Sequence, residues 1–390
     1  MGYSYLGNVK KQYFIKLFQS LVPAYVIERL FWQERGVGVQ GVVWCEIIYA
    51  ATVILLEIPS GVLADRFGRK RMLLVAGLLD VAELVILLYA RGLWAFGLAV
   101  FLAGVGRALC SGSDSALLYD SLLIGGRQGD FEKLLGRLSA IDMAGSMAAA
   151  LSGGLMASAL GFEFNYIVSA CSVGVAFLIS LTLREPPMRT ELAEKPQYTK
   201  QALAIFRAEP LLLLYCLTGT MLGACMIYLD EFWQLILEHV GVPVALFGAA
   251  SALICFSKIP GNMLAYQLKE RFSYRAILTV ILAVNTLGYT AVFLTRNALC
   301  LIPMAVVSLA TGIADPLVAG YLHHRAESSV RATTESFASL GLRLVSMPVG
   351  LIFGAVSARF AIFAGFLPLA VICAGWLAVF WAWHNKKRAA

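Results

Sequence analysis

Charged residues are scarce in this chain of 390 residues: they make up 14% of it, whereas hydrophobic residues make up 59%. A soluble domain carries about 25% charged residues, so the composition excludes an ordinary soluble fold. The apolar runs are long and continuous rather than alternating with a period of two, which argues against a transmembrane β-barrel. A membrane-spanning helix takes about 20 apolar residues. We therefore expect an all-α integral membrane protein.

The sequence also lacks the motifs of common enzyme and cofactor sites. Its eight cysteines lie in apolar segments without C-x-x-C spacing, which is typical of small buried side chains rather than disulfides or metal ligands. No P-loop and no Ser/His/Asp or zinc-type constellation is present. Residues 1–16 show no cleavage site after an apolar stretch, so we expect the first helix to be retained. We predict no enzyme activity, no cofactor and no metal.

The apolar runs, separated by charged or turn-rich breaks, predict twelve membrane helices. Their expected ranges are 12–33, 40–62, 71–90, 94–120, 137–160, 164–184, 209–231, 243–267, 275–295, 298–322, 335–357 and 361–383. The net charge of +7 does not indicate a nucleic-acid partner, because the cations lie in short loops between these runs. Lys and Arg concentrate on the side that holds both termini, which predicts that both termini are cytoplasmic.

The chain is organised around residues 57–71, where one apolar run ends in EIPSGVLADRFGRKR and the next begins. So many cations beside Asp65 predict a tight, basic loop on the cytoplasmic face. The stretch resembles the loop between the second and third helices of the major facilitator superfamily, roughly G-x-L-A-D-R-x-G-R-K. The matching residues are Gly61, Leu63, Ala64, Asp65, Arg66, Gly68, Arg69 and Lys70. This resemblance implies a fold of twelve helices in two six-helix bundles.

The two halves of the sequence are related by an offset of 201 residues. This offset aligns Glu57-Ile-Pro59 with Lys258-Ile-Pro260, and it matches Asp142 with Arg343. Parallel six-helix repeats with a substrate site between them fit the superfamily that the loop resembles. We expect an N-terminal bundle at 1–184, a cytoplasmic linker at 185–208 and a C-terminal bundle at 209–390.

Ionisable residues inside membrane helices are costly and normally face a cavity or a partner. In the superfamily, helix 2 packs against helix 11 and helix 5 against helix 8. The resemblance therefore implies two ion pairs, Glu57 with Arg343 and Asp142 with Lys258, that form a cytoplasmic gate; static pairing is the alternative. The same offset pairs Arg29 with Asp230 as a candidate outer latch, unless both are simply solvated at their helix ends.

Helix 4 carries Arg107 and Asp114, which are seven residues apart and so nearly share a face of one continuous helix. Arg107 resembles the helix-4 arginine of antiporters in the superfamily. We assign Arg107 to substrate anchoring and Asp114 to proton binding, with mutual pairing inside the bundle as the alternative. Other candidate substrate or proton residues are Glu28, Glu46 and Asp315.

Asp120 ends the predicted fourth helix. By resemblance it pairs with Arg69, with Glu132 as another possible partner, while Asp65 caps the start of helix 11. In helix 5, Gly145, Gly153 and Gly154 keep the small residues that allow close helix packing, although the proline of the antiporter motif is missing. Asp80 and Glu83 share a face of helix 3, and the pattern gives them no function.

We expect a secondary active transporter of a small organic solute, working as a monomer by alternating access in the bacterial inner membrane. Proton-coupled export of a drug or secreted metabolite, for example a siderophore-like chelator, is the favoured interpretation. It rests on the resemblance of residues 57–61 and 113–120 to bacterial exporters. The alternatives are a proton-coupled uptake symporter and a non-transporting sensor or scaffold. A cavity with Arg107 and Arg343 would suit an anionic solute in either direction.

Overall fold

The computed structural model describes residues 3–187, 209–325 and 331–386. The predicted linker therefore lies outside the described residues, apart from residues 185–187. The chain forms two compact units. Unit 1 comprises residues 1–191 together with 243–249, and unit 2 comprises residues 192–242 and 250–390. Every regular element in the described residues is helical, as the composition predicts.

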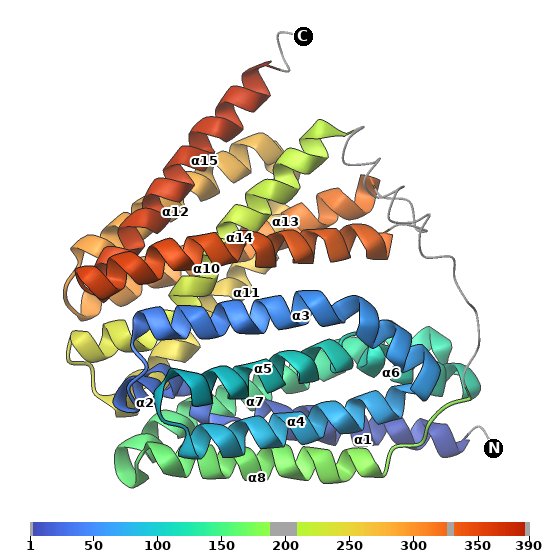
Figure 1. Cartoon of the computed structure of the whole chain (residues 1–390). Helices are drawn as coiled ribbons and strands as arrows, with labels where there is room; N and C mark the ends of the chain where they lie inside the picture. Colours follow the sequence, from blue (N-terminus) through green and yellow to red (C-terminus); the bar gives the residue numbers. More distant parts are fainter. Residues whose placement is uncertain (1–2, 188–208, 326–330, 387–390) are drawn as a thin grey trace. The chain divides into compact units, whose positions relative to one another are not determined.

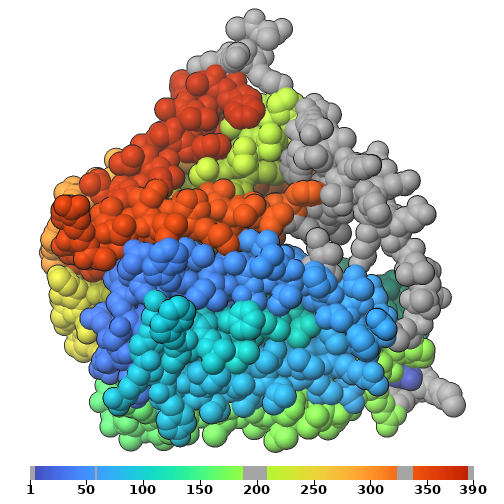
Figure 2. Space-filling view, viewed as in Figure 1, coloured from blue at the N-terminus to red at the C-terminus, as the bar shows by residue number. Residues whose placement is uncertain are grey.

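Unit 1 is built from helices that run side by side along one direction (Figure 1). Its elements are α1 (Tyr3–Ser20), η1 (Pro23–Val26), α2 (Glu28–Glu34), α3 (Val39–Phe67), α4 (Arg69–Tyr89), α5 (Gly92–Cys110), α6 (Ser113–Ile124), η2 (Gln128–Asp130), α7 (Phe131–Leu160), α8 (Phe162–Leu181) and η3 (Val244–Leu246). Helix α5 packs between α3 and α4, α8 packs against α4 and α1, and α1 also packs against α7. Figure 2 shows α3, α4 and the start of α5 as one continuous face of this unit.

Unit 2 has a hydrophobic core to which five helices contribute. Its elements are α10 (Pro210–His239), most of α11 (Phe247–Arg271), α12 (Tyr274–Leu294), η4 (Ala298–Cys300), α13 (Leu301–Arg325), α14 (Arg331–Arg359), η5 (Ile362–Gly365) and α15 (Phe366–Lys386). Leu212, Leu278, Leu282 and Phe380, from α10, α12 and α15, are completely buried in this core. Side chains of α13 and Ala265 of α11 complete the core.

Eleven helical segments of the described residues are long and apolar enough to cross a membrane. The missing twelfth is the first predicted span, 12–33, which the structure divides into α1, η1 and α2. Pro23 lies at the break. Proline has no backbone N–H to continue a helix and disfavours helical geometry in the residue before it. The apolar pattern therefore locates this segment but not its interruption.

The predicted fourth helix, 94–120, is also interrupted. Helix α5 ends at Cys110 and α6 begins at Ser113, because Gly112 adopts the left-handed conformation with φ of 76°. Glycine takes this conformation without the strain that a Cβ atom brings. The prediction that Arg107 and Asp114 share a face of one continuous helix is therefore wrong.

Helix α7 approaches its neighbours closely at glycine positions, where no side chain separates the backbones. A Cβ on Gly153 would lie 2.6 Å from the carbonyl oxygen of Pro23, and one on Gly154 would lie 2.8 Å from that of Val244. Such small residues allow backbones to meet in membrane proteins. These contacts explain why positions 153 and 154 carry glycine, although the proline of the antiporter motif is absent from this helix.

Candidate functional site

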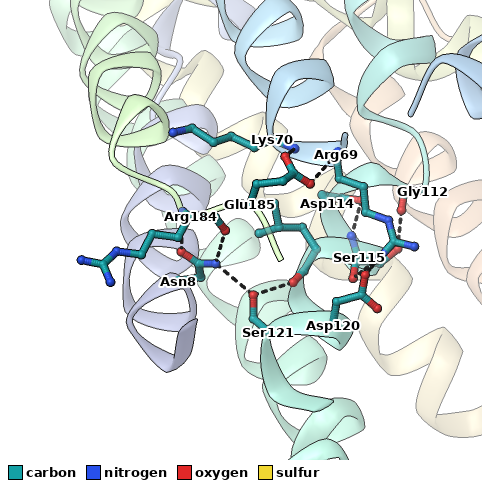
Figure 3. A network of polar contacts seen from close by, with 12 residues as sticks. Asn8, Arg69, Lys70, Gly112, Asp114, Ser115, Asp120, Ser121, Arg184 and Glu185 are labelled. Carbon is teal, nitrogen blue, oxygen red and sulfur yellow. Dashed lines mark hydrogen bonds and ion pairs between the residues drawn. The ribbon is translucent and has the colours of Figure 1, made fainter. Parts of the chain in front are cut away.

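The predicted loop between helices 2 and 3 is reduced in the structure to a single residue, Gly68, between α3 and α4. Its φ of 94° turns the chain, and a Cβ here would lie 2.9 Å from the carboxyl carbon of Glu185. Glu185 follows α8 and accepts hydrogen bonds from the backbone N–H groups of Arg69 (2.9 Å) and Lys70 (2.7 Å) (Figure 3). A carboxylate at this position satisfies orphan donors and complements the dipole of α4. Glycine is thus required here for two reasons: it adopts the positive φ of the turn, and it leaves space for the Glu185 carboxylate.

Arg69 connects the start of α4 to α6. Its guanidinium donates to the carbonyl oxygen of Ala116 at 2.9 Å and forms an ion pair with Asp120 (Figure 3). The structure therefore brings together the two residues that the superfamily pattern pairs. Glu132, the other partner considered, lies in the first turn of α7.

Asn8 fixes α1 to the same region. Its amide nitrogen donates to Ser121 Oγ on α6 and to the carbonyl oxygen of Arg184, both at 2.9 Å, while its amide oxygen accepts from the Arg184 N–H at 3.0 Å (Figure 3). Asn8 is completely buried, so water cannot reach its amide group. The three hydrogen bonds satisfy that group instead. We call Asn8, Arg69, Asp120 and Glu185 the loop network. It joins α1, α4, α6 and the segment after α8.

Lys11 extends the network by donating to the carbonyl oxygen of Thr182 at 2.6 Å. Partial burial, followed by the neighbouring charges of Arg184 and Lys70, lowers the pKa of Lys11. The other charged members of the motif are more exposed. Asp65 and Arg66 lie on the last turn of α3, and the Arg66 guanidinium lies over the Phe67 ring at 5.3 Å. Gly61 is partly buried inside the same helix.

The sequence does not indicate two members of the loop network, Asn8 and Glu185. Glu185 precedes Pro186 and Pro187, which marked it as the start of a linker, and nothing in its local sequence indicates that it reaches the N-terminus of α4. Asn8 was missed because a single buried amide produces no sequence pattern. Both depend on tertiary contacts between segments more than 100 residues apart.

A second group of charges lies among α2, α3, α4 and α5. Arg29 is 4% exposed; it pairs with Glu46 at 2.9 Å and Glu28 at 3.5 Å, and its guanidinium lies 4.6 Å from the Trp32 ring centre. Buried charge is tolerated when it is paired in this way. The predicted outer latch between Arg29 and Asp230 would join the two units and stays a prediction.

Asp80 and Glu83 on α4 have neighbours inside unit 1. A Cβ on Gly106 would lie 3.0 Å from Asp80 Oδ1, so glycine makes room for this carboxylate against α5. Asp80 interacts electrostatically with Arg107, while the electrostatic neighbours of Glu83 are Asp80 and Glu28. Arg107, predicted to anchor substrate, therefore lies within electrostatic range of an acid of the same unit.

Asp114 lies in the first turn of α6. Its Oδ1 accepts from the N–H of Ser115 at 2.7 Å, and its carbonyl oxygen accepts from the Gln12 amide at 3.1 Å. The side chain is exposed. These contacts place it at the start of α6, and proton binding by Asp114 stays a prediction.

The proposed gate residues lie deeper along their helices than the sequence indicates, since α3, α7, α11 and α14 extend beyond the apolar runs. Asp142 on α7 accepts a hydrogen bond from Ser20 and forms an ion pair with Lys16 at 3.3 Å. Glu57 and Arg343 are both partly buried. The pairs Glu57–Arg343 and Asp142–Lys258 join different units, and both stay predictions.

Unit 2 contains a third charged group, which we call the lysine cluster. Lys258 Nζ on α11 lies 2.7 Å from Asp230 Oδ2 on α10, and Asp315 on α13 interacts electrostatically with both. Lys258 approaches α13 closely, since a Cβ on Gly312 would lie 2.5 Å from the Lys258 carbonyl oxygen. Among the described residues, Asp315 has no hydrogen-bond or ion-pair partner.

The placement of Asp230 corrects a prediction. The apolar run ends at Asp230 and Glu231, so the sequence predicts that Asp230 lies at the outer end of helix 7. Helix α10 instead continues to His239, with Leu235, Ile236 and Leu237 buried beyond the two acids. A paired carboxylate interrupts an apolar pattern without ending the helix.

Comparison with known proteins agrees with this architecture. The family model described as "Major Facilitator Superfamily" matches residues 13–334. By fold, the chain is similar to the nucleoside transporter NupG (TM-score 0.77, 12% identity, 96% of this chain and 98% of that one). It is also similar to a D-xylose–proton symporter (TM-score 0.73, 14% identity, 97% of each chain).

A curated relative is the "Drug efflux pump JefA" of Mycobacterium tuberculosis (strain ATCC 25618 / H37Rv). It is 26% identical over 144 residues, which cover 37% of this chain and 28% of the relative. The chain thus spans less than a third of that pump's length in the match. The family model and the structural neighbours describe a membrane transporter and not an enzyme. The chain belongs to the Major Facilitator Superfamily.

Proposed function

We propose that this protein is a proton-coupled exporter of a drug or secreted metabolite, such as a siderophore-like chelator, which works by alternating access. In this proposal it acts as a monomer in the bacterial inner membrane, with both termini in the cytoplasm. A small organic solute and protons are the partners.

The lysine cluster is the observation that carries proton coupling. A carboxylate in a membrane helix costs several kcal/mol unless it is paired or protonated. Lys258 neutralises Asp230 at 2.7 Å, and Asp315 has no ion pair among the described residues. One base shared by two acids leaves one negative charge, and a single proton removes it. In this proposal the two acids share one proton, which suits a group that loads and releases one proton in each cycle.

A buried hydroxyl within electrostatic range of this cluster supports the assignment. Tyr289 on α12 is completely buried, its hydroxyl has no hydrogen-bond partner among the described residues, and it interacts electrostatically with Asp230. A buried polar group without a partner is costly. A hydroxyl in this position is available to a water molecule or a proton on its way to the carboxylates.

The loop network supports alternating access. It fixes α1, α4, α6 and the segment after α8 as one body through charge-assisted hydrogen bonds. In our proposal the gate pairs Glu57–Arg343 and Asp142–Lys258 then form and break as the cycle proceeds. Lys258 would exchange Asp230 for Asp142, which couples the gate to the proton-binding group.

The direction of transport rests on the similarity to JefA, whose name describes efflux. Proton-coupled uptake is the second candidate, since a D-xylose–proton symporter shares the fold. A sensor or scaffold that does not transport is the third. The loop network argues against the third, because a scaffold has no need of a gating device.

Proteoliposomes with an imposed pH gradient test the proposal. Candidate drugs and chelators are first ranked by thermal stabilisation of the purified protein. The best compounds are then added while an entrapped dye reports internal pH. We expect substrate-dependent proton movement that is lost in Asp315→Asn, whereas Asp130→Asn serves as the control, because Asp130 pairs with Arg127 at the surface.

The outcomes separate the three candidates. Export is supported if the solute moves against its gradient and in the direction opposite to the protons. Movement of solute and protons in the same direction supports uptake. Solute flux without proton movement overturns the coupling. Absence of flux for every stabilising compound favours the sensor.

A further inference from the structure

Three basic residues meet at the end of unit 1 that carries the loop network. Lys11 on α1 donates to the carbonyl oxygen of Thr182 at 2.6 Å, and Arg184 follows two residues later along the chain. The backbone N–H of Lys70 on α4 donates to Glu185, the residue after Arg184, at 2.7 Å. These hydrogen bonds bring basic residues together from α1, α4 and the segment after α8. We call Lys11, Lys70 and Arg184 the basic triad.

The charged ends of the basic triad lie close to one another. Figure 3 shows the Lys70 ammonium and the Arg184 guanidinium on the same side of the loop network, away from Asp120. Partial burial, followed by the charges of Arg184 and Lys70, lowers the pKa of Lys11. Like charges at short range repel one another, and an anion between them removes the repulsion. The basic triad is therefore arranged to receive an anion.

The acids of the loop network do not neutralise this region. The loop network and the basic triad together carry two more positive than negative charges; the cations are Lys11, Arg69, Lys70 and Arg184, and the acids are Asp120 and Glu185. Asp120 is paired with Arg69, and both carboxylate oxygens of Glu185 accept backbone N–H groups. Neither Lys11 nor Lys70 forms an ion pair with an acid among the described residues.

An exposed apolar surface continues from the basic triad along the same helices. Phe14, one turn from Lys11 on α1, is 56% exposed, and Leu178 and Leu181 at the end of α8 are 60% and 46% exposed. Helix α8 packs against both α1 and α4, so these side chains border the helices that carry the triad. In a bilayer such a surface is covered by hydrocarbon chains. Positive charge next to an apolar surface suits an amphiphile that carries a phosphate.

We propose that the basic triad binds the phosphate of an anionic phospholipid whose acyl chains lie against α1 and α8. Two ammonium groups and one guanidinium supply charge-assisted donors to the phosphate oxygens. Basic sites between membrane helices are suited to such head groups. The bound lipid connects α1, α4 and the segment after α8 from outside the loop network. This inference goes beyond the proposed function, because lipid binding depends neither on the solute nor on the direction of transport.

The test is equilibrium lipid binding to the purified full-length protein in detergent, measured by native mass spectrometry. The probes are dioleoyl phosphatidylglycerol and dioleoyl phosphatidylcholine, which have the same acyl chains but differ in net charge. Glycerol 3-phosphate carries the phosphate without acyl chains, so it separates a soluble anion from a lipid. We expect the phosphatidylglycerol to bind at least about tenfold more tightly than the phosphatidylcholine, and glycerol 3-phosphate not to displace it.

Variants then locate the site. Lys70→Gln combined with Arg184→Gln removes two charges and keeps the backbone hydrogen bonds of both residues. One basic residue near an anionic lipid is worth about fivefold in affinity, so phosphatidylglycerol should bind this double variant at least about tenfold more weakly. Lys133→Gln removes an exposed cation from the first turn of α7 and should bind as the wild type does. Thermal stability and gel filtration verify folding, and Lys11→Gln, which keeps a donor for Thr182, is the second variant should the double variant be unstable.

Three results would overturn the inference: the two lipids bind equally well, the double variant and Lys11→Gln both retain wild-type affinity, or glycerol 3-phosphate displaces the lipid. The last result would assign the basic triad to a soluble phosphate compound instead of a lipid. Because neither solute nor gradient is present, a failure of proton-coupled transport leaves lipid binding intact. Equal binding of the two lipids, in contrast, would refute the lipid site and leave the proposed function untouched.

Discussion

Removal of the Glu185 carboxylate should loosen the first turn of α4. Both carboxylate oxygens accept backbone N–H groups, those of Arg69 and Lys70, and both orphan donors lose their partner in Glu185→Ala. A cap of this kind is worth about 0.5–2 kcal/mol, and the carboxylate adds about 0.3–1 kcal/mol through the dipole. Since Glu185 is only partly buried, we expect a loss of about 1–2 kcal/mol.

Hydrogen exchange followed by mass spectrometry measures this effect where it occurs. A local loss of about 1.4 kcal/mol raises the exchange rate of the affected amides about tenfold. We expect this increase in peptides that cover residues 68–72. Glu163→Ala is the matched control, because Glu163 lies in the first turn of α8 and its removal should leave exchange at the start of α4 unchanged. Glu185→Gln should fall between the wild type and Glu185→Ala, since it keeps one acceptor oxygen.

A double-mutant cycle with Gly68 tests the geometry itself. Gly68→Ala places a Cβ 2.9 Å from the Glu185 carboxyl carbon and forces alanine to a φ of 94°. The steric part of the penalty disappears in the Glu185→Ala background, whereas the backbone strain stays. The two changes should therefore cost less together than the sum of the single changes, by about 1 kcal/mol. Strict additivity, with unchanged exchange at residues 68–72, would refute the contact and the role we give it.

Three further predictions concern the helix contacts. Arg69→Ala and Asp120→Ala should each lower transport strongly while the double variant loses little more, because one ion pair is lost in every case; additive losses in the transport assay would refute this. Charge reversal of Glu57→Arg with Arg343→Glu should restore flux that either single change abolishes, and failure to restore it counts against the gate. Gly153→Val should destabilise the purified protein by about 2 kcal/mol or more, since its side chain meets the Pro23 carbonyl oxygen at 2.6 Å from Cβ; an unchanged melting temperature would contradict the close packing.

The sequence predicted those features that depend on local patterns. Long apolar runs locate eleven of the spans, and the motif at Gly61–Lys70 indicates both the sharp turn at Gly68 and the ion pair of Arg69 with Asp120. Features that depend on three-dimensional neighbours were missed or placed wrongly. Composition cannot show that Glu185 reaches α4, and charge alone cannot show that α10 continues past Asp230.

Asp80 and Glu83 show why buried charges resist prediction. Their spacing indicates a shared helix face, and the fold family places that helix at the periphery, so nothing in the pattern provides a partner. Their neighbours come from other helices. Gly106 on α5 makes room for Asp80, and Glu28 on α2 lies near Glu83. Only the packing of these helices in unit 1 makes the imbalance of charge visible.

The two units arrange the charged residues of their membrane helices in a similar way, with one base and two acids in a group. In unit 1 Arg29 lies between Glu28 and Glu46, and in unit 2 Lys258 pairs with Asp230 while Asp315 interacts with both. A base shared by two acids can exchange one acid for the other without ever losing its counter-charge, so the large penalty of an unpaired buried ion is avoided. Each such group carries a formal charge of −1 that one proton removes. In the proposed proton coupling, loading one proton on such a group lowers the cost of burying it in the membrane.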